Sequence, residues 1–315
     1  MLNNIIIIVI VIFMSNEIQA GPANLFCPDF DNKKAKTFVI NADDVGMHSS
    51  IDDAAFQLYQ AGKIQTFSLM IPAPTFKSAA AYAKKNNIAV GLHLTLTNEW
   101  QDKLPWSATL RKQQVPSLYN KSGRLWENVQ QLSENANIQE IEQELRAQIE
   151  TALSMGLTVT HLDFHMLFQK ANKSYFELVL ALAQEYQLVM VSTSEQFPHA
   201  KKRQNIKTPD RYLLYYNPNE RAANPTLSTT LYQDMFFSAL PGLHHVAIHP
   251  SIRTPLLKSP LADADFRFDE FNVWSNNELE SAIAKNNIIL TDYQHIKNDI
   301  AKRANCIQDT ASYPE

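Results

Sequence analysis

The chain of 315 residues is 45% hydrophobic, which is enough to bury the core of one large α/β domain or of two smaller ones. Its formal net charge of −4 argues against nucleic acid as a partner, because nucleic-acid-binding proteins carry a basic face that neutralises phosphates. Beyond the N-terminus, no segment is long and apolar enough to span a bilayer.

The first 20 residues have the pattern of a secretory signal peptide, with an apolar run over residues 5–14 and Ala20 at the expected cleavage point. Residues 1–20 are therefore predicted to be removed on export to the periplasm or the medium, which leaves residues 21–36 as an N-terminal extension. No Lys or Arg precedes the run, and Ile18 stands where a small residue is usual, so an uncleaved membrane anchor is the alternative.

The chain has two cysteines, Cys27 near the predicted new N-terminus and Cys306 near the C-terminus. Export permits a disulfide between them. Two unreacted thiols are the equal alternative, because nothing in the spacing tests whether the two residues are close together.

From residue 37 onward, strand and helix patterns alternate along the chain. Strands are predicted over residues 37–42, 65–71, 88–96, 157–164, 188–194, 244–249 and 288–293. Helices are predicted over residues 50–61, 75–87, 138–155, 175–187, 230–239 and 275–287. The stretches 98–137 and 195–229 are irregular and have no assigned role, and residues 263–274 are predicted to form a loop.

This alternation indicates parallel strands with helices packed outside them. Seven such units without a dinucleotide glycine fingerprint favour a closed or nearly closed (β/α) barrel over a doubly wound sheet. With no repeat or linker in the sequence, residues 37–315 are predicted to form a single domain. The site is then expected at the carboxyl ends of the strands.

The first predicted strand ends with two adjacent acids, Asp43 and Asp44. Two ionised carboxylates this close raise one another's pKa, so a cation is the usual compensation, although an acid can also simply cap the next helix. Adjacent strand residues point to opposite faces, so both acids reach one site only where the strand breaks, and Gly46 is expected to supply that break.

Three later strands place a histidine at or near their carboxyl ends, namely His93, His165 and His249. Alternation puts His161 and Asp163 on the same strand face as His165. Each histidine alone could be an ordinary buried residue. One Asp and two His together make the ligand set of a hydrolytic divalent-metal site, and a second carboxylate beside them is a candidate base.

Five segments carry a resemblance to a known family: "VINADDVGMHSSIDDA", "VGLHLTLT", "THLDFH", "VAIHP" and "NNIILTDYQHI". Their order and spacing resemble the YdjC-like carbohydrate deacetylases, which include chitooligosaccharide deacetylase and hopanoid-associated deacetylases. The resemblance runs from about Thr37 to Ile296. It implies a distorted (β/α) barrel of about seven parallel strands, related to polysaccharide deacetylases, that removes acetyl from an N-acetylated sugar or oligosaccharide.

The resemblance also implies residue roles. Asp44, His93 and His165 are expected to hold one divalent metal ion, with Mg²⁺ favoured and Zn²⁺ or another ion as the alternative. Asp43 is the expected catalytic base and His249, in its protonated form, the expected catalytic acid.

The sequence departs from the family pattern at two positions. Leu167 stands where a further histidine is common, and Ser251 stands where a glycine is common. The first departure alters a wall of the site and leaves the proposed ligands intact, so it bears on the substrate more than on the chemistry.

Further residues are candidates for supporting roles around the metal ligands, the base and the acid. His161 and Asp163 are expected to orient a ligand or a substrate hydroxyl, with an ordinary core role as the alternative for His161. Arg267 is a candidate substrate-binding or supporting residue. The loop tryptophans could stack on sugar rings or simply pack, and they are Trp100, Trp106 and Trp126.

Two other functions remain open at this point. One is a metal hydrolase of another ester or phosphoester on the same scaffold, and the other is an exported carbohydrate-binding protein without catalysis. The retained base and acid argue against the second, because a binding protein gains little from them. A homodimer is also left open.

Overall fold

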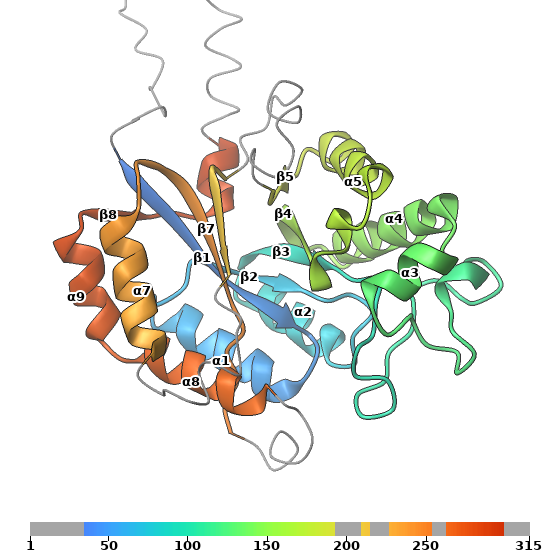
Figure 1. Ribbon diagram of the computed structural model, residues 1–315, viewed down its shortest axis with the longest axis horizontal. Coiled ribbons are helices and arrows are strands. Elements are labelled where there is room, and N and C mark those ends of the chain that lie inside the picture. Colours follow the sequence, from blue (N-terminus) through green and yellow to red (C-terminus); the bar gives the residue numbers. More distant parts are fainter. Residues whose placement is uncertain (1–34, 193–208, 215–226, 254–262, 299–315) are drawn as a thin grey trace, which may run out of the picture.

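The computed structural model describes residues 35–192, 209–214, 227–253 and 263–298 (Figure 1). The strands are β1 (Lys36–Val45), β2 (Thr66–Leu69), β3 (Ala89–Leu94), β4 (Thr158–Phe164), β5 (Val189–Met190), β6 (Arg211–Leu214), β7 (Gly242–Ile248) and β8 (Ile288–Leu290). The α-helices are α1 (Ser49–Gln60), α2 (Phe76–Lys85), α3 (Val129–Asn135), α4 (Ile138–Ser154), α5 (Lys173–Glu185), α7 (Leu227–Ser238), α8 (Ala264–Ser275) and α9 (Glu278–Lys285). Two short 3₁₀ helices are η1 (Pro116–Leu118) and η2 (His165–Lys170).

The strands form one curled sheet in which every described pair is parallel. Their order is β5-β4-β3-β2-β1-β7-β6, and β8 pairs separately with β1. The helices lie around the outside of the curl (Figure 1). The predicted distorted (β/α) barrel is therefore confirmed, with seven strands along the path and one more beside β1. The ends of the path, β5 and β6, are not paired with each other in the described residues.

β1 lies at the centre of the sheet because its apolar residues are covered on both faces. Phe38, Val39 and Ile40 are fully buried. Along one edge β1 pairs with β7. Along the other edge it pairs with β8 near its start and with β2 near its end. The carboxyl end of β1 is thus held between β2 and β7, at the edge of the sheet where the site was expected.

The helices pack on the sheet through apolar faces that the sequence pattern predicts. On α4, Ile141, Leu145 and Ile149 recur at helical spacing and are fully buried. The helix predicted over residues 50–61 begins one residue earlier, at Ser49. The residue that caps α1 is His48, whose Nδ1 accepts a hydrogen bond from the backbone N–H of Ser50, and Ser50 itself is the second residue of the helix.

Buried polar side chains anchor the long connection between β3 and α3, over residues 95–128, to the barrel. The carboxylate of Glu144, on α4, accepts hydrogen bonds from the backbone N–H groups of Thr109 at 2.8 Å and Leu110 at 2.9 Å. The predicted irregular stretch 98–137 is therefore held in place, and it also contains η1 and α3, which the sequence pattern did not reveal.

The predicted loop over residues 263–274 is wrong, because α8 occupies this segment. The buried residues of α8 are Phe266, Arg267, Glu270, Val273 and Trp274. Two charged residues among them break the apolar periodicity by which a helix is recognised. The strand β6 is also missing from the prediction, because it has four residues and lies in a stretch rich in Pro, Asn and Arg.

Several sequence predictions fall outside the described residues. They are the signal peptide or anchor at 1–20, most of the extension 21–36, Cys27, Cys306 and most of the stretch 195–229. Export, the disulfide, the homodimer and the domain division consequently stay predictions. Among the helices in the described parts of the chain, none has the length and apolar character that crossing a membrane requires.

β3 and β4 approach closely where Gly91 faces the buried ring of His161. A Cβ at position 91 would lie 2.2 Å from His161 Nε2, and the ring is held by Thr160 Oγ1 at 2.9 Å and by Tyr293 at a centroid distance of 4.3 Å. Because the ring has no room to move, Gly91→Ala is expected to lower the free energy of unfolding by about 1–3 kcal/mol. Urea denaturation measures this loss.

The same substitution in a His161→Ala background is the control. Removal of the ring leaves space for the added methyl group, so Gly91→Ala should then cost much less. An equal loss in both backgrounds would show that the contact with His161 is not the cause.

Candidate active site

A cavity of about 730 Å³ opens at the carboxyl ends of β1, β3, β4 and β7. Six of the eight predicted site residues line it: Asp43, Asp44, His93, His165, His249 and Arg267. The other two, His161 and Asp163, are buried in the barrel and do not line the cavity. The structure therefore brings together residues that are more than 200 positions apart in the sequence.

The two adjacent acids reach the same cavity because β1 bulges at its end. The register of β1 against β2 shifts between Ala42 and Val45, and Asp44 has a left-handed backbone with φ 64°. Aspartate is one of the few residues other than glycine that adopt this conformation readily. The strand thus turns first at Asp44 and ends just before Gly46, which has φ 102° and is the predicted break.

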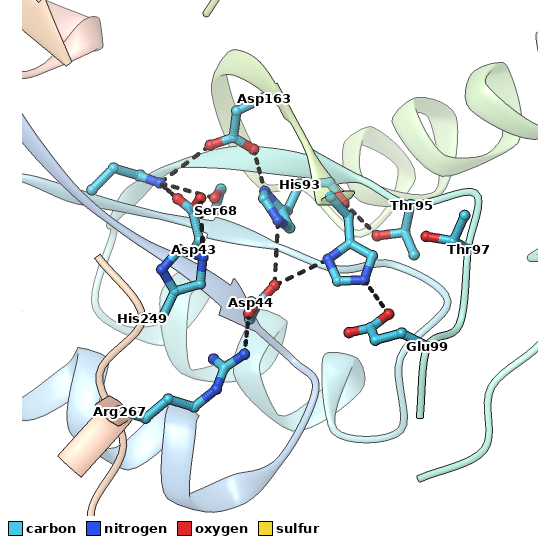
Figure 2. A network of polar contacts seen from close by, with 12 residues as sticks. Asp43, Asp44, Ser68, His93, Thr95, Thr97, Glu99, Asp163, His249 and Arg267 are labelled. Atoms are coloured by element: carbon cyan, nitrogen blue, oxygen red, sulfur yellow. Dashed lines mark hydrogen bonds and ion pairs between the residues drawn. The ribbon is translucent and has the colours of Figure 1, made fainter. Parts of the chain in front are cut away.

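Three donor atoms converge in the cavity, one each from Asp44, His93 and His165 (Figure 2). Oδ1 of Asp44 lies 3.3 Å from Nε2 of His93 and 3.2 Å from Nδ1 of His165. All three side chains are buried. One carboxylate and two imidazoles, with the donor atoms within 4.8 Å of one another, fit the requirements of a divalent metal ion.

A second buried set, Asp43, Asp163 and His245, also has donor atoms within 4.8 Å of one another. Neither Asp163 nor His245 lines the cavity. Asp163 is already engaged, because it accepts hydrogen bonds from His93 and from Asn41. The first set is therefore the one that a substrate can reach.

The other oxygen of Asp44 is paired with Arg267, whose Nη2 lies 2.9 Å from Oδ2. Arg267 also donates from Nε to Asp263 at 2.7 Å. Burial alone would raise the pKa of Asp44, but Arg267 and the two neighbouring imidazoles hold this pKa well below its usual range. Arg267, a weak candidate from the sequence, thus keeps the central carboxylate ionised.

Asp163 orients His93 from the side opposite Asp44. Its Oδ1 lies 2.8 Å from His93 Nδ1, and its Oδ2 accepts from Asn41 Nδ2 at 3.2 Å (Figure 2). Burial disfavours the protonated form of His93, yet the negative charges of Asp163 and Asp43 raise the pKa of His93 well above its usual value. This surplus of negative charge around His93 is what a cation would neutralise.

Glu99 contacts His165 in a similar way, with Oε2 at 2.8 Å from Nε2 (Figure 2). Burial lowers the pKa of His165, but Glu99 and Asp44 together raise it to about 9. Sequence reasoning missed Glu99. The only signal was a carboxylate five residues after the strand that carries His93, in the connection that follows it.

Asp43 belongs to the cavity but not to the set of three donors. It accepts a hydrogen bond from Asn41 Nδ2, and its Oδ2 lies 3.9 Å from His249 Nε2. Burial raises the pKa of Asp43 well above its usual value, and the negative charges of Asp163 and Asp44 act in the same direction, against the opposing effect of His93. Asp43 is thus a stronger base than an exposed aspartate.

His249 follows β7 and is held by Glu270, which accepts a hydrogen bond from its backbone N–H. Glu270 also accepts a hydrogen bond from the hydroxyl of Tyr232, and no sequence pattern indicates either contact. Burial lowers the pKa of His249 to about 3, and the positive charges of Arg267 and His93 contribute. The expectation that this imidazole begins protonated therefore does not match its surroundings, which favour the neutral form.

The remaining residues singled out in the sequence are divided by the structure into packing residues and one cavity residue. His161 is a buried residue packed on Gly91, with burial lowering its pKa to about 4, so the ordinary core role fits it. Of the three loop tryptophans, Trp100 lines the cavity. Trp106 and Trp126 use their indole N–H groups to bond backbone carbonyls of the same loop, as packing residues do.

Residues 37–285 match a family model described as YdjC-like protein. The chain belongs to the YdjC-like family. The predicted resemblance is thus confirmed, and the match covers all the cavity residues named above.

Relatives cover most of the chain at low identity. A carbohydrate deacetylase of Enterococcus faecalis V583 is 27% identical over 83% of this chain and 98% of its own length. A carbohydrate deacetylase of Geobacillus stearothermophilus is 26% identical over 81% of this chain and 96% of its own length. A crystal structure from E. faecalis V583, named as that of a cellobiose-phosphate cleavage protein, has a TM-score of 0.72 at 26% identity and covers 83% of this chain and 98% of its own. The predicted enzyme class, carbohydrate deacetylase, agrees with the names of the curated relatives.

Proposed function

We propose that the protein is a metal-dependent hydrolase that removes an N-acetyl group from an amino sugar or oligosaccharide. The observation that carries this proposal is the convergence of Asp44, His93 and His165 in one cavity, with Asp43 and His249 beside them. The set combines a site for a cation with a neighbouring base and a second proton-transfer group, which is what amide hydrolysis requires. The names of the relatives support carbohydrate deacetylation as the reaction.

Asp44, His93 and His165 would hold the metal ion. When bound, such an ion polarises the acetamide carbonyl and lowers the pKa of a water molecule. The resemblance favours Mg²⁺, whereas two imidazole donors favour a transition-metal ion such as Zn²⁺. Metal analysis of the purified protein decides between them.

Asp43 is placed to take a proton from the attacking water, because it faces the cavity and is not one of the three donors. Its Oδ2 is 3.9 Å from His249 Nε2, so a small movement lets the proton pass to the neutral imidazole. His249 then donates it to the sugar nitrogen as the C–N bond breaks, which releases acetate and a free amine.

The cavity walls suit a sugar. A volume of about 730 Å³ lies within the usual range of about 300–1,000 Å³ for small-molecule sites. Trp100 and Tyr212 supply aromatic surface, on which sugar rings stack. Met166 and Leu167, which follow His165, add an apolar wall on the side where the family pattern commonly has a histidine.

Acetate release tests this proposal directly. The protein is incubated with a panel of N-acetylated monosaccharides and oligosaccharides, and with O-acetyl esters and phosphoesters as alternatives. Release from the N-acetylated sugars supports the proposal. Hydrolysis confined to the esters or phosphoesters would instead support the alternative hydrolase, and no turnover of any substrate would support a binding protein.

Removal of the metal should abolish the reaction. Because the three donors serve no purpose in the mechanism without a cation, treatment with a chelator is expected to stop acetate release, and a divalent ion is expected to restore it. The rate before chelation, after it and after re-addition is the measurement. Full activity in a preparation shown by elemental analysis to be metal-free would contradict the metal site.

A further inference from the structure

Glu99 belongs to the loop that follows β3 and contacts His165, one of the three donor residues. Its Oε2 lies 2.8 Å from Nε2 of His165, and its side chain also lines the cavity, with 24% of its surface exposed. The contact joins the loop that follows β3 to the residue that follows β4. Nothing in the proposed reaction so far uses this carboxylate.

The loop around Glu99 is fixed by its buried neighbour Asn98. The side-chain oxygen of Asn98 accepts from the backbone N–H groups of Trp100 at 3.0 Å and Gln101 at 2.8 Å. Its side-chain nitrogen donates to the carbonyl of Trp106 at 3.1 Å, and its backbone N–H donates to the carbonyl of Trp126 at 2.7 Å. Glu99 therefore projects from a tightly bonded turn, and its position does not depend on the contact with His165.

The two histidines of the donor set present different nitrogens to Asp44. His93 turns Nε2 toward Oδ1 of Asp44, while its Nδ1 faces Asp163 at 2.8 Å. His165 turns Nδ1 toward the same oxygen, while its Nε2 faces Glu99. Both nitrogens of each ring therefore face a carboxylate, and the nitrogen beside Asp44 is the one that points into the set of three donors. When a metal ion takes the place of the proton there, the remaining ring proton lies on the nitrogen that faces Asp163 or Glu99, because a carboxylate only accepts hydrogen bonds. The opposite nitrogen is then the one that can bind a metal ion.

We propose that Glu99 is a positioning residue for His165, which selects Nδ1 of His165 as a metal donor in the way that Asp163 selects Nε2 of His93. The metal site thus has one carboxylate behind each imidazole, Asp163 from β4 and Glu99 from the connection that follows β3. This inference rests on the metal site of the proposed function, but not on the identity of the substrate.

The first test uses Zn²⁺ as a diamagnetic probe and the wild-type protein. Long-range nitrogen–proton NMR spectra of the protein labelled with ¹⁵N-histidine show which ring nitrogen of each imidazole binds zinc. We expect two imidazoles to change on addition of Zn²⁺, one bound through Nε2 with a protonated Nδ1 and one bound through Nδ1 with a protonated Nε2. Two imidazoles that both bind through Nε2 would overturn the proposal.

The second test measures Zn²⁺ affinity by competition with a chelator. Loss of a carboxylate that supports a metal ligand typically costs about 10- to 100-fold in metal affinity, and we expect this loss in Glu99→Ala. Glu99→Gln should lose less, because the amide oxygen still accepts from Nε2 of His165. The matched control is Asp102→Asn, which removes a charge from the same loop and cavity at a residue paired with Arg124 instead.

Three results separate this proposal from the proposed reaction. Equal zinc affinity in Glu99→Ala and Asp102→Asn overturns the role of Glu99 and leaves the deacetylase proposal standing. Zinc bound through one Nδ1 and one Nε2 in a protein that releases no acetate supports the role of Glu99 and contradicts the reaction. A wild-type protein that binds no zinc overturns the role of Glu99 stated above, while the deacetylase proposal is then decided by chelation and re-addition of other divalent ions. If Glu99→Ala does not fold, the wild-type NMR spectra and the zinc affinity of Glu99→Gln still test the role of Glu99.

Discussion

Asp44→Asn is expected to lose both its metal ion and its activity. The substitution removes the charged donor of the set of three and one carboxylate paired with Arg267, which keeps its contact with Asp263. Asparagine also adopts left-handed backbone conformations, so the bulge at φ 64° should survive. Elemental analysis and acetate release, measured on the same preparation, should both fall to the background of the chelated wild type.

The control for Asp44→Asn is Asp265→Asn, which removes one negative charge from an exposed residue of α8. This variant should keep its metal and its rate. If Asp44→Asn retained a full equivalent of metal, Asp44 would not be a ligand, and the donor set would have to be redrawn.

Asp43→Asn is expected to separate chemistry from metal binding. It leaves the three donors in place and keeps nearly the same side-chain shape, but an amide cannot take a proton from water at neutral pH. Loss of a positioned general base typically lowers the rate by about 10²- to 10⁴-fold. We expect kcat to fall by this factor while the metal content and KM change little.

The comparison of the two aspartate variants has a second possible outcome. A protein that loses its metal on Asp43→Asn and keeps it on Asp44→Asn would reverse the two roles. The set of Asp43, Asp163 and His245 would then be the cation site.

Much of the fold and of the site followed from periodicity. The alternation of strand and helix patterns gave a parallel sheet with helices outside it, and this is what β1 to β5, β7 and β8 form. Alternation along each strand also placed His93 and His165 with their side chains toward one side of the sheet. Because the carboxyl ends of parallel strands meet at one edge, residues at strand ends converge even when they are distant in sequence.

The parts that could not be predicted depend on contacts between distant segments. The helix α8 buries Arg267 and Glu270, and polar partners make that burial favourable. Arg267 pairs with Asp44 and Asp263, and Glu270 accepts hydrogen bonds from the hydroxyl of Tyr232 and from the backbone of His249. No local pattern reveals such partners. The same holds for Glu99, because its role depends on a contact with His165, which lies 66 positions later in the sequence.

The bulge at Asp44 was also beyond the sequence pattern. A strand that continues regularly would point Asp43 and Asp44 to opposite faces. The backbone instead turns already at Asp44, two residues before the predicted break at Gly46, which itself has a φ of 102°. Aspartate at such a position is unusual, and such unusual backbone conformations cluster at functional sites.

The position of β1 in the sheet has a consequence for how the protein assembles. Along one edge, β1 pairs from Lys36 to Ala42 with β7, about 200 residues later, and at its start it also pairs with β8, about 250 residues later. During synthesis, the strand that carries both aspartates leaves the ribosome long before these partners, and until they arrive the backbone N–H and C=O groups that would pair with them stay unpaired. Such long-range pairing folds slowly and exposes aggregation-prone surface in the meantime. A nascent chain that ends before β7 should therefore be a poorly folded species that depends on chaperones, with no partial catalytic site.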